Sequence, residues 1–120
     1  MARPAIVLFG HGSRDPDWRR PIEAVAERLR RTDTQAAVRC AYLELSTPDL
    51  ATAVGDLVAG GASAVRVVPM FLGVGRHARE DLPALVRALE AAYPAVAFVL
   101  APAIGEDERV LDLLAEIARE

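Results

Sequence analysis

Short apolar runs and longer segments with helical spacing alternate four times along the chain. The apolar runs predict strands over residues 5–9, 37–43, 64–70 and 96–101. Nearly every position in them is apolar, which is typical of strands buried on both faces of a parallel sheet. Arg66 interrupts the third run, so its side chain is expected to be more exposed to solvent than its neighbours.

After each run, apolar residues recur every three or four positions, as in a helix with one buried face. The spacing predicts helices over about 15–31 or 19–31, 48–59, 79–92 and 106–119. Pro21 leaves the start of the first helix open between Asp15 and Arg19.

Capping and proline positions refine these helices. Thr47 is the expected N-cap of the second helix, with Pro48 as its first residue. Pro83 fits the third helix only if it lies in the first turn. The last helix carries an apolar stripe that is expected to face the core, formed by Val110, Leu113, Leu114 and Ile117.

Four strands in alternation with four helices predict an α/β fold. We expect a four-stranded, mainly parallel sheet of flavodoxin-like type, with helices on both faces. The 120 residues suit one domain, 1–120, and the 52% hydrophobic residues are enough for a core.

Charge and cysteine content reduce the number of possible functions. With 14 basic and 17 acidic residues the net charge is −3, which does not fit a nucleic-acid-binding footprint. Cys40 is the only cysteine, within an apolar run. We see no signal-peptide layout and no run of membrane-spanning length, so a cytoplasmic protein without a membrane partner is expected.

Three potential metal ligands follow the first three predicted strands. His11 and His77 are the only histidines, both in glycine-flanked loops, and Glu44 ends the second strand. With the strands in the order 2-1-3, these loops would fall within about 10 Å of one another. Two imidazoles and a carboxylate suit Co(II), Ni(II), Fe(II) or Zn(II), and three ligands leave coordination positions open.

Each of these residues also has an ordinary structural interpretation. A loop histidine is often a surface or capping group, and a glutamate at a strand end is usually solvated. The segment Gly73-Val74-Gly75 is a poor dinucleotide fingerprint, because it lacks the third glycine and follows the third strand.

Arginines flank both histidines. Arg14, Arg76 and Arg79 either pair with neighbouring acids or form a cationic rim for a substrate with several carboxylates. Ser13 either donates a hydrogen bond there or caps the following helix.

Several motifs resemble one known family. Four segments carry the resemblance: Leu8-Phe9-Gly10-His11-Gly12-Ser13-Arg14-Asp15-Pro16, Tyr42-Leu43-Glu44-Leu45-Ser46-Thr47-Pro48, Val68-Pro69-Met70-Phe71-Leu72-Gly73-Val74-Gly75-Arg76-His77-Ala78-Arg79-Glu80-Asp81-Leu82-Pro83 and Ala101-Pro102-Ala103-Ile104-Gly105. They are similar to the CbiX/SirB small sirohydrochlorin chelatases. The resemblance covers essentially the whole chain, and the two histidine blocks in this order are its most specific part.

The resemblance implies a chelatase-like half domain that inserts a divalent metal into sirohydrochlorin, for cobalamin or sirohaem synthesis. Co2+ is the leading metal, with Fe2+ or Ni2+ as alternatives, and no organic cofactor is expected. His11 and His77 would bind the metal and Glu44 would assist. The short length implies a homodimer with the tetrapyrrole between its subunits.

Two other functions remain open. Gly-His-Gly after a strand faintly resembles the histidine phosphatases, although Gly10 stands where they have arginine. Alternatively, the protein is a non-catalytic module that binds or delivers a metal or a tetrapyrrole with the same three ligands. Turnover would separate that module from a chelatase.

Overall fold

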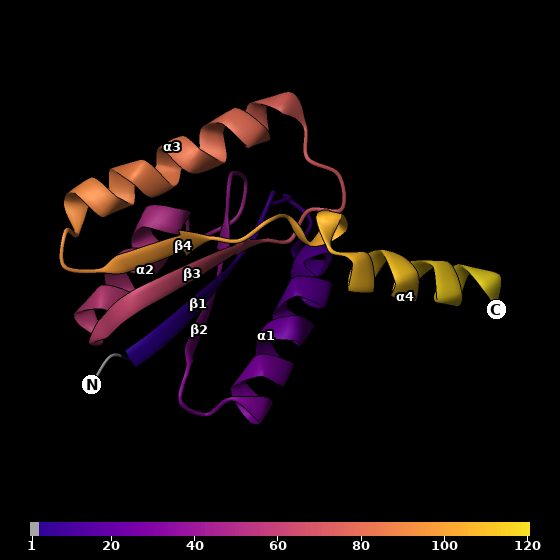
Figure 1. The fold of residues 1–120 in the computed structure, drawn as a ribbon, viewed down its shortest axis with the longest axis horizontal. Helices are drawn as coiled ribbons and strands as arrows, with labels where there is room; N and C mark the ends of the chain where they lie inside the picture. The colour runs from indigo at the N-terminus through magenta and orange to yellow at the C-terminus, as the bar shows by residue number, and fades with distance from the viewer. Residues whose placement is uncertain (1–2) are drawn as a thin grey trace.

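The computed structural model describes residues 3–120, and its centre is a parallel sheet (Figure 1). The four strands lie in the order β2-β1-β3-β4, which confirms the predicted α/β fold and the 2-1-3 order. Leu8 lies opposite Cys40 on β2 and Val68 on β3. The strands are β1 (Arg3–Gly10), β2 (Ala37–Tyr42), β3 (Ala62–Pro69) and β4 (Ala97–Leu100).

Helices lie on both faces of this sheet, as predicted. One face carries α1, and the other carries α2 and α3 (Figure 1). The helices are α1 (Arg20–Thr32), α2 (Leu50–Ala59), α3 (Arg76–Ala92) and α4 (Glu108–Arg119), with short 3-10 turns η1 (Pro16–Arg19) and η2 (Ile104–Glu106).

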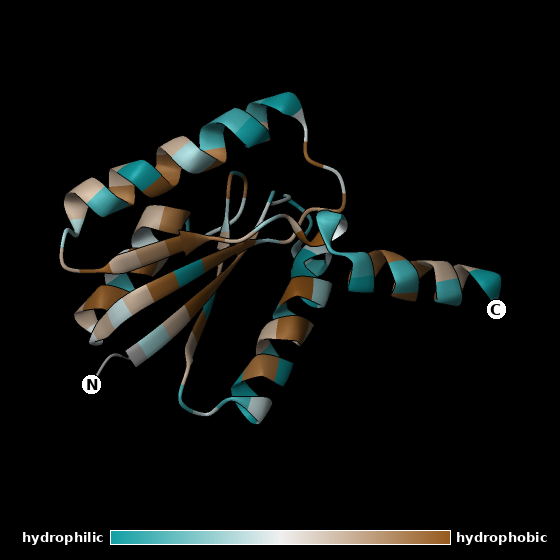
Figure 2. Cartoon of the chain, viewed as in Figure 1, coloured by the Kyte–Doolittle hydropathy of each residue, from teal (hydrophilic) through white to brown (hydrophobic). Residues whose placement is uncertain are grey.

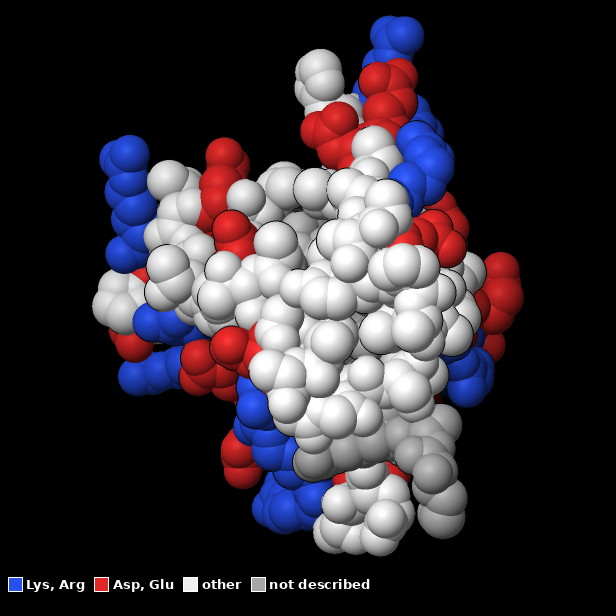
Figure 3. Space-filling model, turned by 90° about the vertical axis from the view of Figure 1, so that its left-hand side faces the viewer, with Lys and Arg blue, Asp and Glu red and all other residues white. Residues whose placement is uncertain are grey.

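Side-chain alternation along the strands divides the core in two. On β1, Val7 and Phe9 pack toward α2 and α3, whereas Leu8 packs toward Ile22 and Ala26 of α1. Brown, hydrophobic positions therefore line the strands and the inner sides of α1, α2 and α3 (Figure 2). The side of the molecule at which the strands begin shows a broad uncharged area with charged side chains around it (Figure 3).

The start of α2 differs from the prediction. Its N-cap is Asp49, whose carboxylate accepts a hydrogen bond from the Thr52 N–H at 2.9 Å. Pro48 stays outside the helix because its carbonyl accepts a hydrogen bond from the Tyr42 N–H, also at 2.9 Å. The assignment of Thr47 as the cap was therefore wrong by two residues.

The start of α3 also differs. It begins at Arg76, three residues earlier than predicted, with Gly75 as its extended N-cap. Pro83 is therefore inside the helix and not in its first turn. Leu85 is 36% exposed, whereas Leu82 and Leu89 of the same helix are buried.

The last helix is the largest departure. No residue of α4 is buried, and the helix projects away from the sheet and from α1 (Figure 1). The stripe predicted to face inward is therefore open, with Leu113 and Ile117 each 55% exposed. Among residues 3–120, none of the helices is both long and apolar enough to span a membrane.

Candidate functional site

The loops that follow the strands are joined through their backbones at the carboxyl edge of the sheet. The Leu43 N–H donates to the Gly10 carbonyl at 2.9 Å, and the Glu44 N–H donates to the His11 carbonyl at 3.0 Å. On the other side of β1, the Met70 N–H donates to the Phe9 carbonyl at 2.8 Å. The loops after β1, β2 and β3 thus meet at one edge, as in other doubly wound sheets.

Two glycines permit close approaches within this edge. Gly12 has a φ of 98°, and a Cβ there would lie on the Glu44 carbonyl oxygen. A Cβ on Gly105 would lie on the Leu72 carbonyl oxygen, and the Gly105 N–H donates to the Phe71 carbonyl at 3.0 Å. Any side chain at either position would force the neighbouring loop away.

His11 is held by an aromatic contact. Its ring centroid lies 4.3 Å from that of Phe71, with 31° between the ring planes. Phe71 is 3% exposed and in turn packs on Phe9 at 6.2 Å. The His11 side chain itself is exposed. Its imidazole is therefore supported on one side and open to a ligand from solvent.

Ser13 has a structural role in the same loop. Its N–H donates to the Ser46 hydroxyl at 3.1 Å, and that hydroxyl donates to the Ser13 carbonyl at 2.8 Å. The Ser13 hydroxyl accepts from the Asp15 N–H at 3.1 Å, at the entry to η1. These bonds fix the loops of His11 and Glu44 relative to each other, while the Glu44 side chain remains exposed.

His77 lies in the first turn of α3 and not in a loop, because the helix begins at Arg76. Its side chain is exposed. Arg76 forms an ion pair with Glu80 at 3.5 Å. Of its two interpretations, pairing with a neighbouring acid therefore applies. Both side chains are largely in solvent, where such a pair contributes little to stability.

The structure does not gather His11, Glu44 and His77 into a formed centre. Within residues 3–120, no group of three or more His, Cys, Asp or Glu side chains could hold a metal ion as it stands. Glu44 is tied to His11 through the backbone, and His77 is on a different element. Assignment of the metal to these residues therefore stays a prediction.

The three arginines do not share one pocket. Arg14 lines a pocket of about 210 Å³ together with Arg19, Ser13, Ser46 and Leu45. Arg79 lines a smaller hollow of about 140 Å³ that also contains Glu106. Arg14 is therefore the better placed of the two to receive a carboxylate near His11.

An apolar pocket of about 380 Å³ adjoins the loop of His11. Its lining includes Gly10, Trp18, Val25, Met70 and Ile104. Trp18 is 41% exposed and stands edge-on to Tyr42, with ring centroids 6.1 Å apart. A flat conjugated ligand could bury its faces against such side chains.

Sequence reasoning missed Phe71, Trp18, Leu45 and Leu72 as site residues. Leu45 is 55% exposed and lines a pocket with Ser13. Leu72 follows Phe71 in the chain and is 64% exposed. For Phe71, Leu72 and Leu45 the available signal was that large apolar residues closely follow predicted strands, where loops are usually polar. Exposed apolar side chains at a strand-end loop are consistent with a binding surface.

Cys40 and Tyr42 do not extend the donor set. Burial raises the pKa of the Cys40 thiol above its usual range. Burial likewise raises the pKa of Tyr42 to about 12, and its hydroxyl has no hydrogen-bond partner within the described part of the chain. Both groups are therefore protonated at neutral pH, and a metal requires the thiolate form of cysteine.

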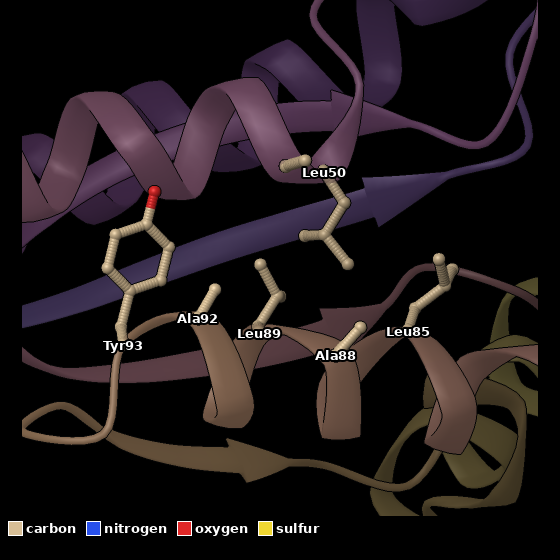
Figure 4. Close-up of a pocket in the computed structure, with 7 residues that line it drawn as sticks. Leu50, Leu85, Ala88, Leu89, Ala92 and Tyr93 are labelled. Atoms are coloured by element: carbon tan, nitrogen blue, oxygen red, sulfur yellow. The ribbon is translucent and has the colours of Figure 1, made fainter.

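A separate groove of about 230 Å³ lies between α2 and α3 (Figure 4). It is lined by apolar side chains such as Leu50, Leu85 and Leu89, and Tyr93 closes one end. The Tyr93 hydroxyl lies next to Gly55, 3.5 Å from where a Cβ would be. This groove offers no metal ligand.

These features define an α/β protein with a parallel sheet and histidines that follow its first and third strands. The chain belongs to the CbiX family, whose model matches residues 5–120.

A sirohydrochlorin cobaltochelatase from Sulfolobus acidocaldarius is 30% identical over 96% of this chain and 89% of its own length. The crystal structure of the CbiX protein from Marinobacter aquaeolei VT8 has a TM-score of 0.84 and 35% identity, over 97% of this chain and 94% of that one.

SirB from Bacillus subtilis subspecies spizizenii, solved in complex with cobalt, has a TM-score of 0.82 and 27% identity. The match covers 98% of this chain but 50% of SirB. Four further curated relatives, named sirohydrochlorin cobaltochelatases or ferrochelatase, match over 36% to 60% of their own lengths. The chain thus spans about half the length of several curated relatives.

Proposed function

We propose that this protein is a sirohydrochlorin chelatase that inserts Co2+ into the tetrapyrrole. Fe2+ and Ni2+ are the alternative substrates. The observation that carries the proposal is the family match over residues 5–120, together with relatives that are named for this reaction. The reaction would serve cobalamin or sirohaem synthesis in the cytoplasm.

Metal insertion has a simple charge balance. A dication enters the macrocycle, and two pyrrole N–H protons leave it. An exposed, neutral imidazole can hold the metal and release it, and a second imidazole or a carboxylate can accept a proton. We assign the metal to His11 and His77. Glu44 would accept one pyrrole proton, and the imidazole that the metal leaves first would accept the other. The metal is cargo in this reaction, so exposed and incomplete ligation suits it.

The surroundings of His11 offer contacts for both parts of the substrate. The apolar pocket beside Gly10 and Trp18 would receive the macrocycle, and the pocket of Ser13 and Arg14 would receive a carboxylate. Bidentate arginine–carboxylate pairs fix orientation as well as position. Arg76 and Arg79 would contact further carboxylates from the other side of the site. Binding metal and ring face to face would remove much of the entropic cost of their encounter.

We further propose that this single domain functions as a homodimer with the substrate between its subunits. The match to 50% of SirB supports this, because a second copy could supply the part of such a chain that one copy does not match. The exposure of the His11 and Arg14 side chains supports it as well, since a second copy could cover the substrate from the open side.

The test is the absorbance change of sirohydrochlorin when it takes up Co(II). The H11A/H77A double variant should lose at least about 100-fold in kcat/KM, the lower end for such a group. Glu44→Gln should slow insertion at unchanged metal affinity. Glu90→Gln, an exposed glutamate on α3, is the matched control and should retain the wild-type rate.

Two results would overturn the proposal. Wild-type rates in the folded double variant would remove both histidines from the reaction. Stoichiometric binding of Co(II) or sirohydrochlorin, without acceleration of insertion over the buffer reaction, would identify a binding or delivery module instead.

A further inference from the structure

The loop after β2 holds one leucine in a strained backbone conformation. Among residues 3–120, Leu45 is the only residue other than glycine with a φ in the left-handed region, at 63°. The Ser46 N–H donates to the Glu44 carbonyl at 2.8 Å, so the three residues form a γ-turn with positive φ, which is rare. A leucine in this region brings its Cβ close to a carbonyl oxygen, which is unfavourable. The turn therefore needs other contacts to hold it.

Those contacts come from the loop after β1. The parallel pairing of β1 with β2 continues past both strands as far as the Glu44 N–H, which donates to the His11 carbonyl at 3.0 Å. Beyond that point a side chain continues the series. The Ser46 hydroxyl accepts from the Ser13 N–H at 3.1 Å and donates to the Ser13 carbonyl at 2.8 Å. The strained turn is thus fixed at both ends to one neighbouring loop.

The Glu44 side chain depends on this turn for its position. It is exposed, and within residues 3–120 its carboxylate takes part in no ion pair. Its location is therefore set by its own backbone, which carries one end of the γ-turn. Backbone strain persists only where the surroundings determine it, and it is concentrated at functional sites. Here the strained residue directly follows the proposed proton acceptor.

Loss of the Ser46 hydroxyl would release the turn. The bond from Glu44 to His11 would then be the last of the series, and the ends of such series open most easily. Leu45 could relax to a negative φ, and Glu44 would move relative to His11. Reacting groups must be placed closely, since a misplacement of about 1 Å can cost roughly 100-fold in rate. Ser46 would thus affect the reaction without touching the substrate.

We propose that Ser46 is a positioning residue for metal insertion. Its hydroxyl holds the turn at Leu45 and so keeps Glu44 next to His11. This role rests on the proposed function. Ser46 also lines the pocket of Arg14, but the one proton of its hydroxyl is donated to the Ser13 carbonyl. It is therefore not available to a carboxylate of the substrate.

The first test is the steady-state rate of cobalt insertion. Ser46→Ala should lower kcat about tenfold, with unchanged KM for sirohydrochlorin and unchanged Co(II) affinity. The loss is smaller than for a full misplacement because the Glu44 N–H can still bond to His11. Ser46→Thr keeps the hydroxyl and should retain the wild-type kcat. A raised KM at unchanged kcat would mean that Ser46 binds the substrate directly, and would overturn the positioning role.

Ser63→Ala is the matched control. Ser63 is near the start of β3, at the opposite end of the strand from the site, and its buried hydroxyl has no hydrogen-bond partner within the described residues. It should therefore keep the wild-type kcat. Circular dichroism checks that all variants are folded.

A double-variant cycle tests whether Ser46 acts through Glu44. In the Glu44→Gln background the group to be positioned is already lost, so Ser46→Ala should lower kcat no further. Independent contributions would instead multiply, giving a further tenfold loss. That result would show that Ser46 acts by another route and would refute its role in placing Glu44.

A suppressor tests the strained turn itself. Asparagine adopts the left-handed region more readily than leucine does. In the Ser46→Ala background, Leu45→Asn should therefore recover most of the lost kcat, because the turn no longer needs the hydroxyl. If the double variant stays as slow as Ser46→Ala alone, the hydroxyl does not act by holding this turn.

Hydrogen exchange of the Glu44 amide, measured by NMR, is independent of activity. Exchange should become several-fold faster in Ser46→Ala and return to the wild-type rate in Ser46→Thr. Unchanged exchange in folded Ser46→Ala would refute the positioning role. A fully active Ser46→Ala would also refute it and leave the chelatase function standing. A wild type that inserts no cobalt would refute the function, and the role that rests on it.

Discussion

Among single-residue substitutions, we expect a change at Phe71 to have the most specific effect on metal binding at the site. Its ring supports the His11 imidazole at 4.3 Å, and such aromatic contacts are worth about 0.5–1.5 kcal/mol. We therefore expect Phe71→Leu to weaken Co(II) binding about three- to tenfold, because the imidazole loses its fixed orientation. Calorimetric titration of the protein with Co(II) measures this change.

Phe9→Leu is the matched control for that variant. Phe9 is as deeply buried and packs on Phe71, but it is not in ring contact with His11. Both variants should lose stability, whereas only Phe71→Leu should lose Co(II) affinity. Equal affinities in the two variants would mean that Phe71 is simply a core residue.

Candidate metal ligands were easier to recognise in the sequence than the residues that would support them. His11, Glu44 and His77 stand out because their side chains can bind metals and they follow strands. Phe71 does not stand out, since an aromatic residue after a strand looks like core. Gly12 does not stand out in the sequence either. It adopts a φ of 98° where the Glu44 carbonyl approaches it, and that contact joins distant parts of the chain.

At the level of elements, the start of α2 gives a clear prediction. Asp49→Ala should lower Tm by about 5 °C, because the Thr52 N–H loses its acceptor. Thr47→Ala, at the position that the sequence favoured, should leave Tm within about 1 °C. A larger fall in Thr47→Ala than in Asp49→Ala would contradict this cap. Differential scanning calorimetry at neutral pH measures both.

The same cap has a pH dependence of known sign. The hydrogen bonds from Thr52 hold the pKa of Asp49 below its usual range in the folded protein. A lowered pKa stabilises the fold above the unfolded pKa of about 3.9, and this stabilisation is lost as the pH falls through the folded value. The Tm difference between wild type and Asp49→Ala should therefore shrink below about pH 4.

Element type was easier to predict than element boundaries. The four strands and four helices follow from apolar spacing, which reports local periodicity directly. The starts of α2 and α3 depend on tertiary contacts that periodicity does not contain. Pro48 is kept out of α2 by the Tyr42 N–H, and Gly75 allows α3 to begin three residues early, with Pro83 inside it.

At the scale of the whole molecule, the stripe of α4 was predicted to face inward, and the single chain leaves it exposed. An amphipathic pattern indicates that one face of a helix is covered, but it does not indicate by which chain. The prediction that the stripe faces the core of its own chain was therefore wrong.

The proposed homodimer should unfold with a concentration-dependent Tm, because unfolding releases two chains. A tenfold rise in protein concentration adds about 1.4 kcal/mol per dimer and should raise Tm by about 3 °C. Calorimetry over a hundredfold concentration range measures this slope. A wild-type Tm that does not change over that range would mean that the chain folds and unfolds alone, and would refute the homodimer.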